Sequence, residues 1–159
     1  MVRAVIPPAA AWSVVVLDSN VVLDWLLFRN SDGLMLGAAL TSGRLRWIAT
    51  AAMRDELTHV LARGDFDAWG QDLTALWSAW DRCCAEVPVP VPMPAAAAGR
   101  YRCTDPDDQK FIDLALATRP CLLLSRDRAV LKLARPLRDA GIDVMTPAAW
   151  AIRAGATSG

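Results

Sequence analysis

The chain has 159 residues, of which 54% are hydrophobic and 21% are charged, so it can bury the core of one compact domain and is too apolar for wholesale disorder. Its 17 basic and 17 acidic residues balance, so the net charge argues neither for nor against a nucleic-acid partner. A nuclease with this balance would have to place its basic residues locally, because long-range attraction to phosphate would be weak. Four cysteines without a C-x-x-C pair argue against a disulfide scaffold and against a structural zinc site.

The beginning of the chain has an apolar stretch that is too short for a secretory signal, because Pro7 and Pro8 break it. We therefore expect an N-terminal arm over residues 1–12, one domain over residues 13–154, and a tail over residues 155–159. Asp18 and Asp24 interrupt the best candidate for a membrane span. The expected location is the cytoplasm, without membrane attachment.

The first half of the chain is expected to contain two strands and four helices. Residues 13–17 are β-branched without alternation, which is typical of a strand covered on both faces, and residues 45–49 form the second strand. Asn20 is expected to cap a buried helix over 21–28, and Thr50 to cap a helix over 51–62. The other two helices cover about 32–43 and about 67–86, the latter with an apolar stripe of Trp69, Leu73, Leu76, Trp77 and Trp80.

The second half begins with alternating prolines over 88–94, which favour an extended connector. Asp105 and Pro106 then begin a helix that runs to about Thr118. Strands over 121–124 and 142–145 follow, with a helix from Arg126 or Asp127 between them and a last helix capped at Thr146. Strands that alternate with helices predict an α/β fold: a three-layer α/β/α sandwich with a mostly parallel sheet. Ligands bind such sheets at the carboxyl ends of the strands.

Two acidic residues follow apolar strands directly. Asp18 comes after the first strand and Asp127 after the third, so both emerge at one edge of the sheet if these strands are parallel neighbours. An aspartate at the start of a helix is also a common capping residue, and this alternative stays open for each of them alone.

Two further acids lie on helices. Glu56 borders the apolar stripe of its helix, whereas Asp55 points away from it. Asp108 lies near the middle of the apolar face set by Phe111 and Ile112. A carboxylate that leans toward a core is costly unless it is paired or binds metal. The alternatives are a glutamate whose head reaches water and an aspartate that favours the helix dipole.

Together these four acids predict a metal site. Clustered carboxylates repel one another unless a divalent cation neutralises them, and oxygen ligands select Mg²⁺ or Mn²⁺ over zinc. Such ions can activate water and stabilise the charge on a phosphodiester during an in-line displacement.

Four segments of the chain resemble the PIN-domain family, and most closely its prokaryotic toxin components related to VapC-type toxins. They are Val-Val-Leu-Asp18-Ser-Asn20-Val-Val, Glu56 in Arg-Asp-Glu-Leu, Thr104-Asp-Pro-Asp-Asp108-Gln-Lys-Phe-Ile, and Leu-Ser125-Arg-Asp127-Arg. The resemblance covers about residues 14–150. It implies a metal-dependent ribonuclease with an α/β/α sandwich fold, neutralised by a small antitoxin protein.

The resemblance also implies the site residues. Asp18, Glu56, Asp108 and Asp127 match the family's acidic quartet, which binds Mg²⁺ or Mn²⁺ and acts in catalysis, and Asn20 and Ser125 match supporting polar positions. Many relatives have a further acid where this chain has Ala129, which bears on a second metal ion. Asp107 is the alternative to Asp108 as the third ligand.

Basic residues flank the expected acidic edge and are candidates for holding RNA phosphates: Arg100, Arg102, Lys110, Arg126 and Arg128. The alternative for each is an ordinary solvated charge. Asp24 lies in a buried helix, either as support for the site or as a contact for a partner's arginine. His59 is expected on the surface.

Two other functions remain as alternatives. One is a binding module that keeps a PIN-like fold and a partner surface for protein or RNA but hydrolyses little. The other is aspartate-based phosphotransfer, which the chain fits poorly because its haloacid-dehalogenase form needs an aspartate where Asn20 stands. The abundant apolar residues over 21–28 and in the tryptophan stripe lead us to expect an interface with an antitoxin or with a second copy of the chain.

Overall fold

The structure is a computed structural model that describes residues 12–64 and 73–157. Within these ranges, five strands form one fully parallel sheet in the order β3-β2-β1-β4-β5. The strands are Val14–Leu17 (β1), Arg46–Ala49 (β2), Cys84–Glu86 (β3), Cys121–Leu124 (β4) and Ile142–Met145 (β5). The central strand β1 places Val16 opposite Ile48 of β2 and Leu123 of β4.

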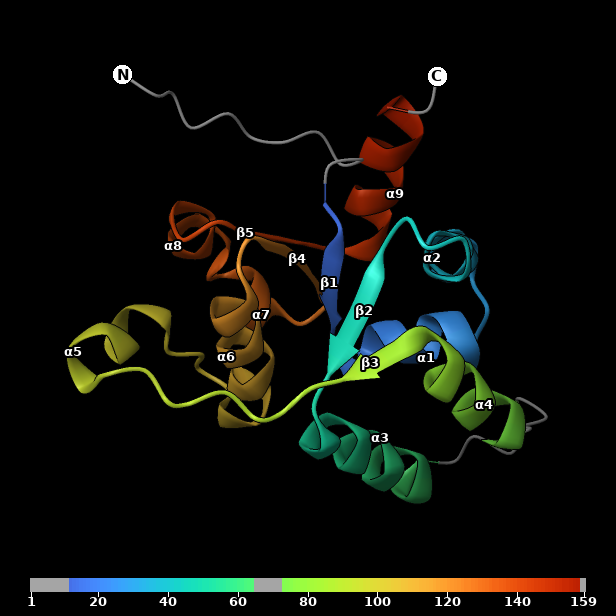
Figure 1. Ribbon diagram of the computed structural model, residues 1–159, viewed down its shortest axis with the longest axis horizontal. Coiled ribbons are helices and arrows are strands. Elements are labelled where there is room, and N and C mark those ends of the chain that lie inside the picture. Colours follow the sequence, from blue (N-terminus) through green and yellow to red (C-terminus); the bar gives the residue numbers. More distant parts are fainter. Residues whose placement is uncertain (1–11, 65–72, 158–159) are drawn as a thin grey trace.

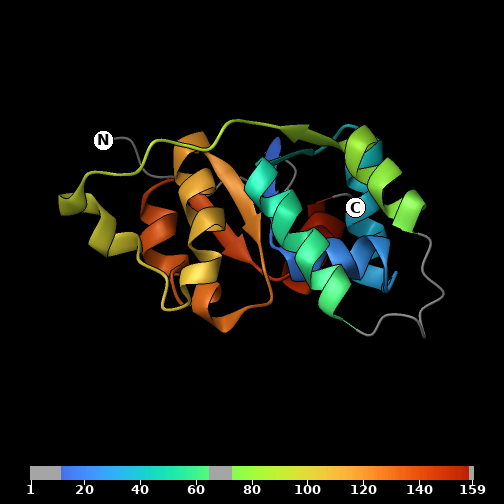
Figure 2. The same cartoon turned by 90° about the horizontal axis from the view of Figure 1, so that it is seen from below.

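Helices cover both faces of the sheet. They are Ser19–Leu26 (α1), Ser31–Thr41 (α2), Ala51–Arg63 (α3), Leu73–Cys83 (α4), Ala95–Ala98 (α5), Gln109–Thr118 (α6), Arg128–Leu131 (α7), Ala134–Asp139 (α8) and Pro147–Thr157 (α9), with 3-10 turns at Gly99–Tyr101 (η3) and Pro106–Asp108 (η4). Figures 1 and 2 show α6 and α8 on one side of the sheet and α1, α2 and α9 on the other. The α/β class and the sandwich with a parallel sheet are confirmed.

The core explains why the strands lack alternation. Val15 and Val16 of β1 and Leu122 and Leu123 of β4 are fully buried, because side chains on both faces of these inner strands meet helices. Trp47 of β2 is also fully buried. Two tryptophans pack edge-on against it, Trp25 at 5.7 Å and Trp80 at 4.6 Å between ring centroids.

Two glycines let α2 approach α1 closely. A Cβ added at Gly33 would collide with the backbone of Asp24, and one added at Gly37 would collide with the indole of Trp25. The two glycines lie one turn apart on α2, so the contact runs along the helix. This packing fixes α1, which carries polar residues of the candidate site.

The structure corrects two expectations about elements. The helix expected over about 67–86 ends at Cys83, and Cys84–Glu86 instead forms the edge strand β3, because these residues pair with β2 just before Pro88 ends regular structure. The start of that expected helix and Trp69 lie outside the described residues. Asn20 does not cap α1: the N-cap position is Asp18, and the Asn20 side chain accepts instead from the backbone N–H of Arg126 at 3.4 Å.

None of the helices in the described part of the chain has the length and apolarity that a membrane crossing requires.

Candidate metal centre

The carboxyl ends of β1 and β4 bring the first two acids together. Asp18 follows β1 directly, and Asp127 lies three residues beyond the end of β4, at the N-cap of α7. The two strands are parallel neighbours, and the backbone N–H of Asp18 donates to the carbonyl of Leu124 at 3.0 Å. The parallel pairing therefore places both carboxylates at one edge of the sheet, as the sequence predicts.

Asp108 reaches the same point from the 3-10 turn that precedes α6. Asp105 caps this turn by accepting from the backbone N–H of Asp107 at 3.0 Å. Asp107 is exposed, whereas Asp108 is 7% exposed. One carboxylate oxygen from each of Asp18, Asp108 and Asp127 lies within 4.8 Å of the other two. The structure thus places Asp108, and not Asp107, in the acidic group.

The electrostatics of this group are those of carboxylates crowded without a countercharge. Burial, contact with the carboxyl of Asp127 and the charge of Asp18 raise the pKa of Asp108 to about 8. Burial also raises the pKa of Asp18, against the lowering effect of its hydrogen bond with Ser125. The contact with Asp108 lowers the pKa of Asp127. Near neutral pH, Asp108 therefore retains a proton that it shares with Asp127.

The donor set fits a hard divalent cation. All three groups offer carboxylate oxygens, the ligands that Mg²⁺ and Mn²⁺ prefer. The Asp108 Oδ2 atom is buried and has no hydrogen-bond partner among the described residues. A buried acceptor without a donor is costly, and a cation in place of the shared proton would satisfy it.

Ser125 links the two strand ends through its side chain. Its hydroxyl donates to Asp18 Oδ2 at 2.6 Å and accepts from the backbone N–H of Asp127 at 2.9 Å. Ser125 is fully buried, so no solvent competes for these bonds. One serine thus orients the Asp18 carboxylate and fixes the backbone of Asp127.

Glu56 lies outside the group of three and has partners of its own. Its carboxylate accepts from the Ser19 hydroxyl at 2.7 Å and forms an ion pair with Lys110 Nζ at 2.6 Å. Its charge nevertheless contributes to the raised pKa of Asp18, which places it beside the group. The structure therefore brings Asp18, Asp108 and Asp127 together as potential ligands and holds Glu56 at their rim.

The basic candidates differ in their surroundings. Lys110 is engaged with Glu56, and Arg126 makes a two-bond ion pair with Asp24 of α1. The arginine that contacts Asp24 is therefore one of this chain. Arg102 and Arg128 are exposed. The remaining candidate, Arg100, lies 3.6 Å from Asp139.

Two residues that the sequence analysis did not single out support the site. Ser19 holds Glu56, and Gln109 ties the segment before η4 to α6 by accepting from Cys103 N at 2.7 Å and donating to the Tyr101 carbonyl at 3.0 Å. Each directly follows one of the candidate acids, which is the signal that could have identified them. His59 is exposed, as expected.

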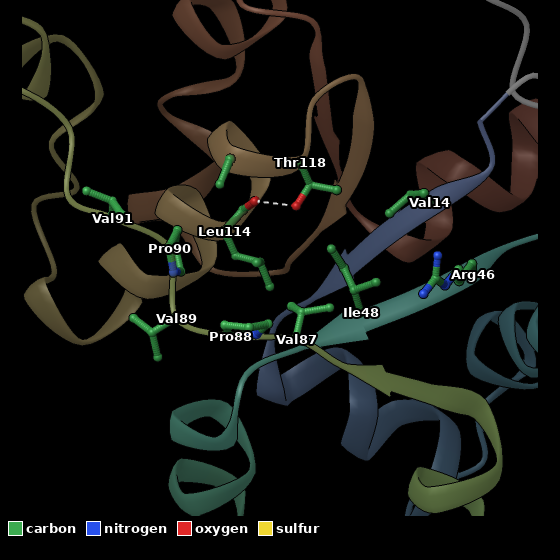
Figure 3. A pocket seen from close by; sticks show the side chains of 11 residues that line it. Val14, Arg46, Ile48, Val87, Pro88, Val89, Pro90, Val91, Leu114 and Thr118 are labelled. Atoms are coloured by element: carbon green, nitrogen blue, oxygen red, sulfur yellow. Dashed lines mark hydrogen bonds between the residues drawn. The ribbon is translucent and has the colours of Figure 1, made fainter.

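An apolar groove of about 400 Å³ lies apart from the acids. It is bounded by the connector over 87–91, by the first residues of β1 and β2, and by the last turns of α6. Figure 3 shows Val87, Val89 and Leu114 around it, and its lining contains no acidic residue. The groove is therefore not part of the candidate metal centre.

Most of the chain matches one known protein family. Residues 14–129, well over half of the chain, match the family described as PIN domain. This segment contains Asp18, Glu56, Asp108 and Asp127. A search among curated proteins gave no match. The family match and the parallel α/β fold together lead to one conclusion: the chain belongs to the PIN domain family.

Proposed function

We propose that the chain is a Mg²⁺- or Mn²⁺-dependent endoribonuclease that acts as the cytoplasmic toxin of a toxin–antitoxin pair. PIN domains are in general nucleases that act on RNA and bind divalent metal ions. The observation that carries the proposal is the meeting of three carboxylates within 4.8 Å. The buried Asp108 Oδ2 atom, which has no hydrogen-bond partner among the described residues, supports it.

Asp18, Asp108 and Asp127 would hold the cation, with Glu56 beside them. When bound, a divalent cation supplies positive charge to the phosphodiester oxygens and lowers the pKa of a water molecule that can then attack phosphorus. Ser125 orients the Asp18 carboxylate for this role. Asp108 must release its proton before it can act as a ligand, because the pKa of its carboxyl is about 8.

Lys110 and Glu56 add a second element to the site. Lys110 Nζ is held between Glu56 Oε1, at 2.6 Å, and the carbonyl of Asp107, at 2.5 Å. The ammonium group of Lys110 therefore lies beside Glu56, at the rim of the three clustered aspartates. We infer that Lys110 contacts a phosphate of the RNA and that Glu56 positions it, a role different from that of the three clustered aspartates.

The toxin assignment rests on the resemblance of the four motifs to VapC-type toxins. Most apolar residues over 21–28 pack in the core of the chain, because those from Val21 to Trp25 are buried. Exposed apolar residues lie elsewhere, with Val89 and Val91 of the connector 69% and 89% exposed. A small antitoxin or a second copy of the chain would bury them. Light scattering of the purified chain, alone and with the product of a short neighbouring gene, tests whether such an interface exists. A chain that stays monomeric and binds no such product contradicts the proposed interface.

Cleavage of several RNAs, with and without Mn²⁺, tests the nuclease proposal. Several substrates are needed because a toxin can be selective for one target. Metal-dependent products that disappear in Asp127→Asn are the expected result. A folded, metal-binding chain that cuts none of the RNAs would instead favour the binding module that retains the fold and a partner surface.

A further inference from the structure

A second hollow, of about 260 Å³, shares the loop after β4 with the candidate metal centre. It lies between the N-terminal ends of α2 and α9 and the loop after β4, and its lining includes Asp24, Asn30, Asp32, Arg126, Thr146 and Ala148. Arg126 precedes Asp127 in the chain, so the hollow and the acidic group meet at one loop. We call this hollow the Arg126 pocket.

An ion pair between the buried Asp24 and the half-exposed Arg126 forms one wall of the Arg126 pocket. Arg126 Nε donates to Asp24 Oδ2 at 2.8 Å, and Nη2 donates to Oδ1 at 2.9 Å. The Asp24 side chain is 6% exposed, whereas that of Arg126 is 49% exposed. The pair thus fixes the guanidinium in one plane and leaves further N–H groups for a ligand.

The surroundings of Asp24 make this arrangement rigid. The backbone of Asp24 is the surface against which Gly33 packs, so α1 and α2 cannot separate without opening this contact. One turn earlier on α1, Asn20 accepts from the backbone N–H of Arg126 at 3.4 Å. Two residues of α1 therefore hold Arg126, Asn20 through its backbone and Asp24 through its side chain. A buried charge at position 24 is not needed to stabilise the core.

The chemistry of the pocket suits a nucleobase better than a phosphate. Both oxygens of Asp24 already accept from Arg126. The carboxylate of Asp32 would repel a phosphate group inside the pocket but can accept from the N–H groups of a base. The Asn30 side-chain oxygen accepts from Gly33 N, which leaves its amide N–H₂ as a donor. The polar groups of the pocket therefore match the mixed donors and acceptors of a base edge.

We propose that the Arg126 pocket binds one nucleotide of single-stranded RNA next to the phosphate that is cut, with the base inside and a phosphate on Arg126. Asp24 is a positioning residue that orients Arg126. The proposal rests on the proposed ribonuclease function and adds a pocket for one unpaired base beside the metal centre, since a paired base cannot enter a pocket. It also gives a role to Asp24, which lies outside the metal centre.

The Asp24→Asn variant tests the positioning role through RNA affinity. Removal of one negative charge should strengthen RNA binding if only net charge matters. We expect the opposite, an affinity about tenfold weaker, because Arg126 loses its fixed orientation. The probe is a fluorescein-labelled, mixed-sequence, single-stranded RNA of twelve nucleotides, followed by anisotropy in the Asp108→Asn background so that cleavage does not interfere. Asp55→Asn is the matched control, since it removes an exposed charge on α3, outside the pocket lining.

A second variant tests the pocket without disturbing the ion pair. Ala148 is exposed in the first turn of α9, so Ala148→Leu should fold normally while filling the hollow. We expect it to weaken binding of the single strand about tenfold and to leave binding of the same RNA in a duplex unchanged. Ala38→Leu, at an exposed position of α2 outside the pocket lining, is its control.

The outcomes separate this inference from the ribonuclease proposal. Unchanged or tighter RNA binding in Asp24→Asn, or unchanged binding in Ala148→Leu, overturns the inference even if the chain cuts RNA. No binding of single-stranded RNA by the chain with intact Asp24 and Ala148 overturns it as well. Pocket-dependent binding without metal-dependent cleavage supports the inference and contradicts the nuclease proposal.

Discussion

The Ser125 hydroxyl donates a 2.6 Å hydrogen bond to Asp18 Oδ2 and so joins two residues that are 107 positions apart. The same hydroxyl accepts from the backbone N–H of Asp127. Because Ser125 is fully buried, the bond orients one carboxylate and the backbone of another in a place that water does not reach.

Replacement of Ser125 should therefore weaken metal binding without removing a ligand. We expect Ser125→Ala to lower Mn²⁺ affinity by about tenfold to a hundredfold, the usual effect of losing a residue that orients a metal ligand. Isothermal calorimetry measures it. Ser42→Ala, at an exposed position after α2, is the control and should bind as the unaltered chain does. Equal affinities in all three proteins would show that Ser125 does not orient the site.

The raised pKa of Asp108 predicts how stability depends on pH in the metal-free chain. The pKa of this carboxyl is 3.8 when unperturbed and about 8 in the fold, so the folded state binds more protons than the unfolded state between these values. The free energy of unfolding should therefore fall as pH rises through this window. Urea denaturation with a chelator present, at about pH 5 and about pH 8, measures the change.

Asp108→Asn should flatten this pH dependence, because the amide does not titrate, and Asp107→Asn should retain it, because Asp107 is exposed. The residual slope in Asp108→Asn would come in part from Asp18, whose pKa burial also raises. A pH profile of Asp108→Asn that matches that of the unaltered chain would contradict the assignment of the shared proton to Asp108.

Glu56 offers a way to separate metal binding from substrate contact. Its carboxylate is paired with Lys110 and lies outside the group of three. We expect Glu56→Gln to keep Mn²⁺ affinity within about threefold, while RNA cleavage falls by at least about tenfold as Lys110 loses its partner. Lys110→Met should show the same pattern. Loss of Mn²⁺ affinity in Glu56→Gln as large as that in Asp18→Asn would instead make Glu56 a ligand.

The close contact of α1 and α2 should be visible in stability. A Cβ at position 37 would overlap the Trp25 indole, so Gly37→Ala should destabilise the fold by about 1–3 kcal/mol, the range for overpacking a core. Gly155→Ala, where an added Cβ meets nothing within 4 Å, is the matched control. Denaturant unfolding measures both. If Gly37→Ala and Gly155→Ala unfold with equal midpoints and slopes, α2 can move away from α1 at little cost.

Local patterns predicted much of the fold. The strands over 121–124 and 142–145 have the expected bounds, because short apolar runs between turn residues leave few alternatives. Strand β3 lies where the sequence predicts the end of a helix, because Cys84–Glu86 has no strand pattern of its own and forms a strand by pairing with the edge of β2. Asn20 does not cap α1, because the backbone is already helical at Ser19, directly after the N-cap Asp18, and a residue pattern does not show backbone angles.

The acidic group was also predictable in part from local patterns in the sequence. Strand order puts Asp18 and Asp127 together, and helix periodicity selects Asp108 over Asp107. The contacts of Glu56 with Ser19 and Lys110 depend on how helices from different parts of the chain pack. The contact of Asp24 with Arg126 depends on how α1 packs against the loop after β4. Sequence periodicity gives the face of a helix and not its neighbour, so these pairings needed the structure.

The central claim is that Asp18, Asp108 and Asp127 form one metal-dependent site for cutting RNA. Mn²⁺-dependent cleavage by Asp108→Asn, compared with that by Asp107→Asn, tests it most directly, since the two variants alter adjacent residues in the same way. We expect Asp108→Asn to lose at least about a hundredfold in rate, the scale of losing a key electrostatic contributor, and Asp107→Asn to stay close to the unaltered chain. Abolished cleavage in Asp107→Asn together with full activity in Asp108→Asn would contradict the claim.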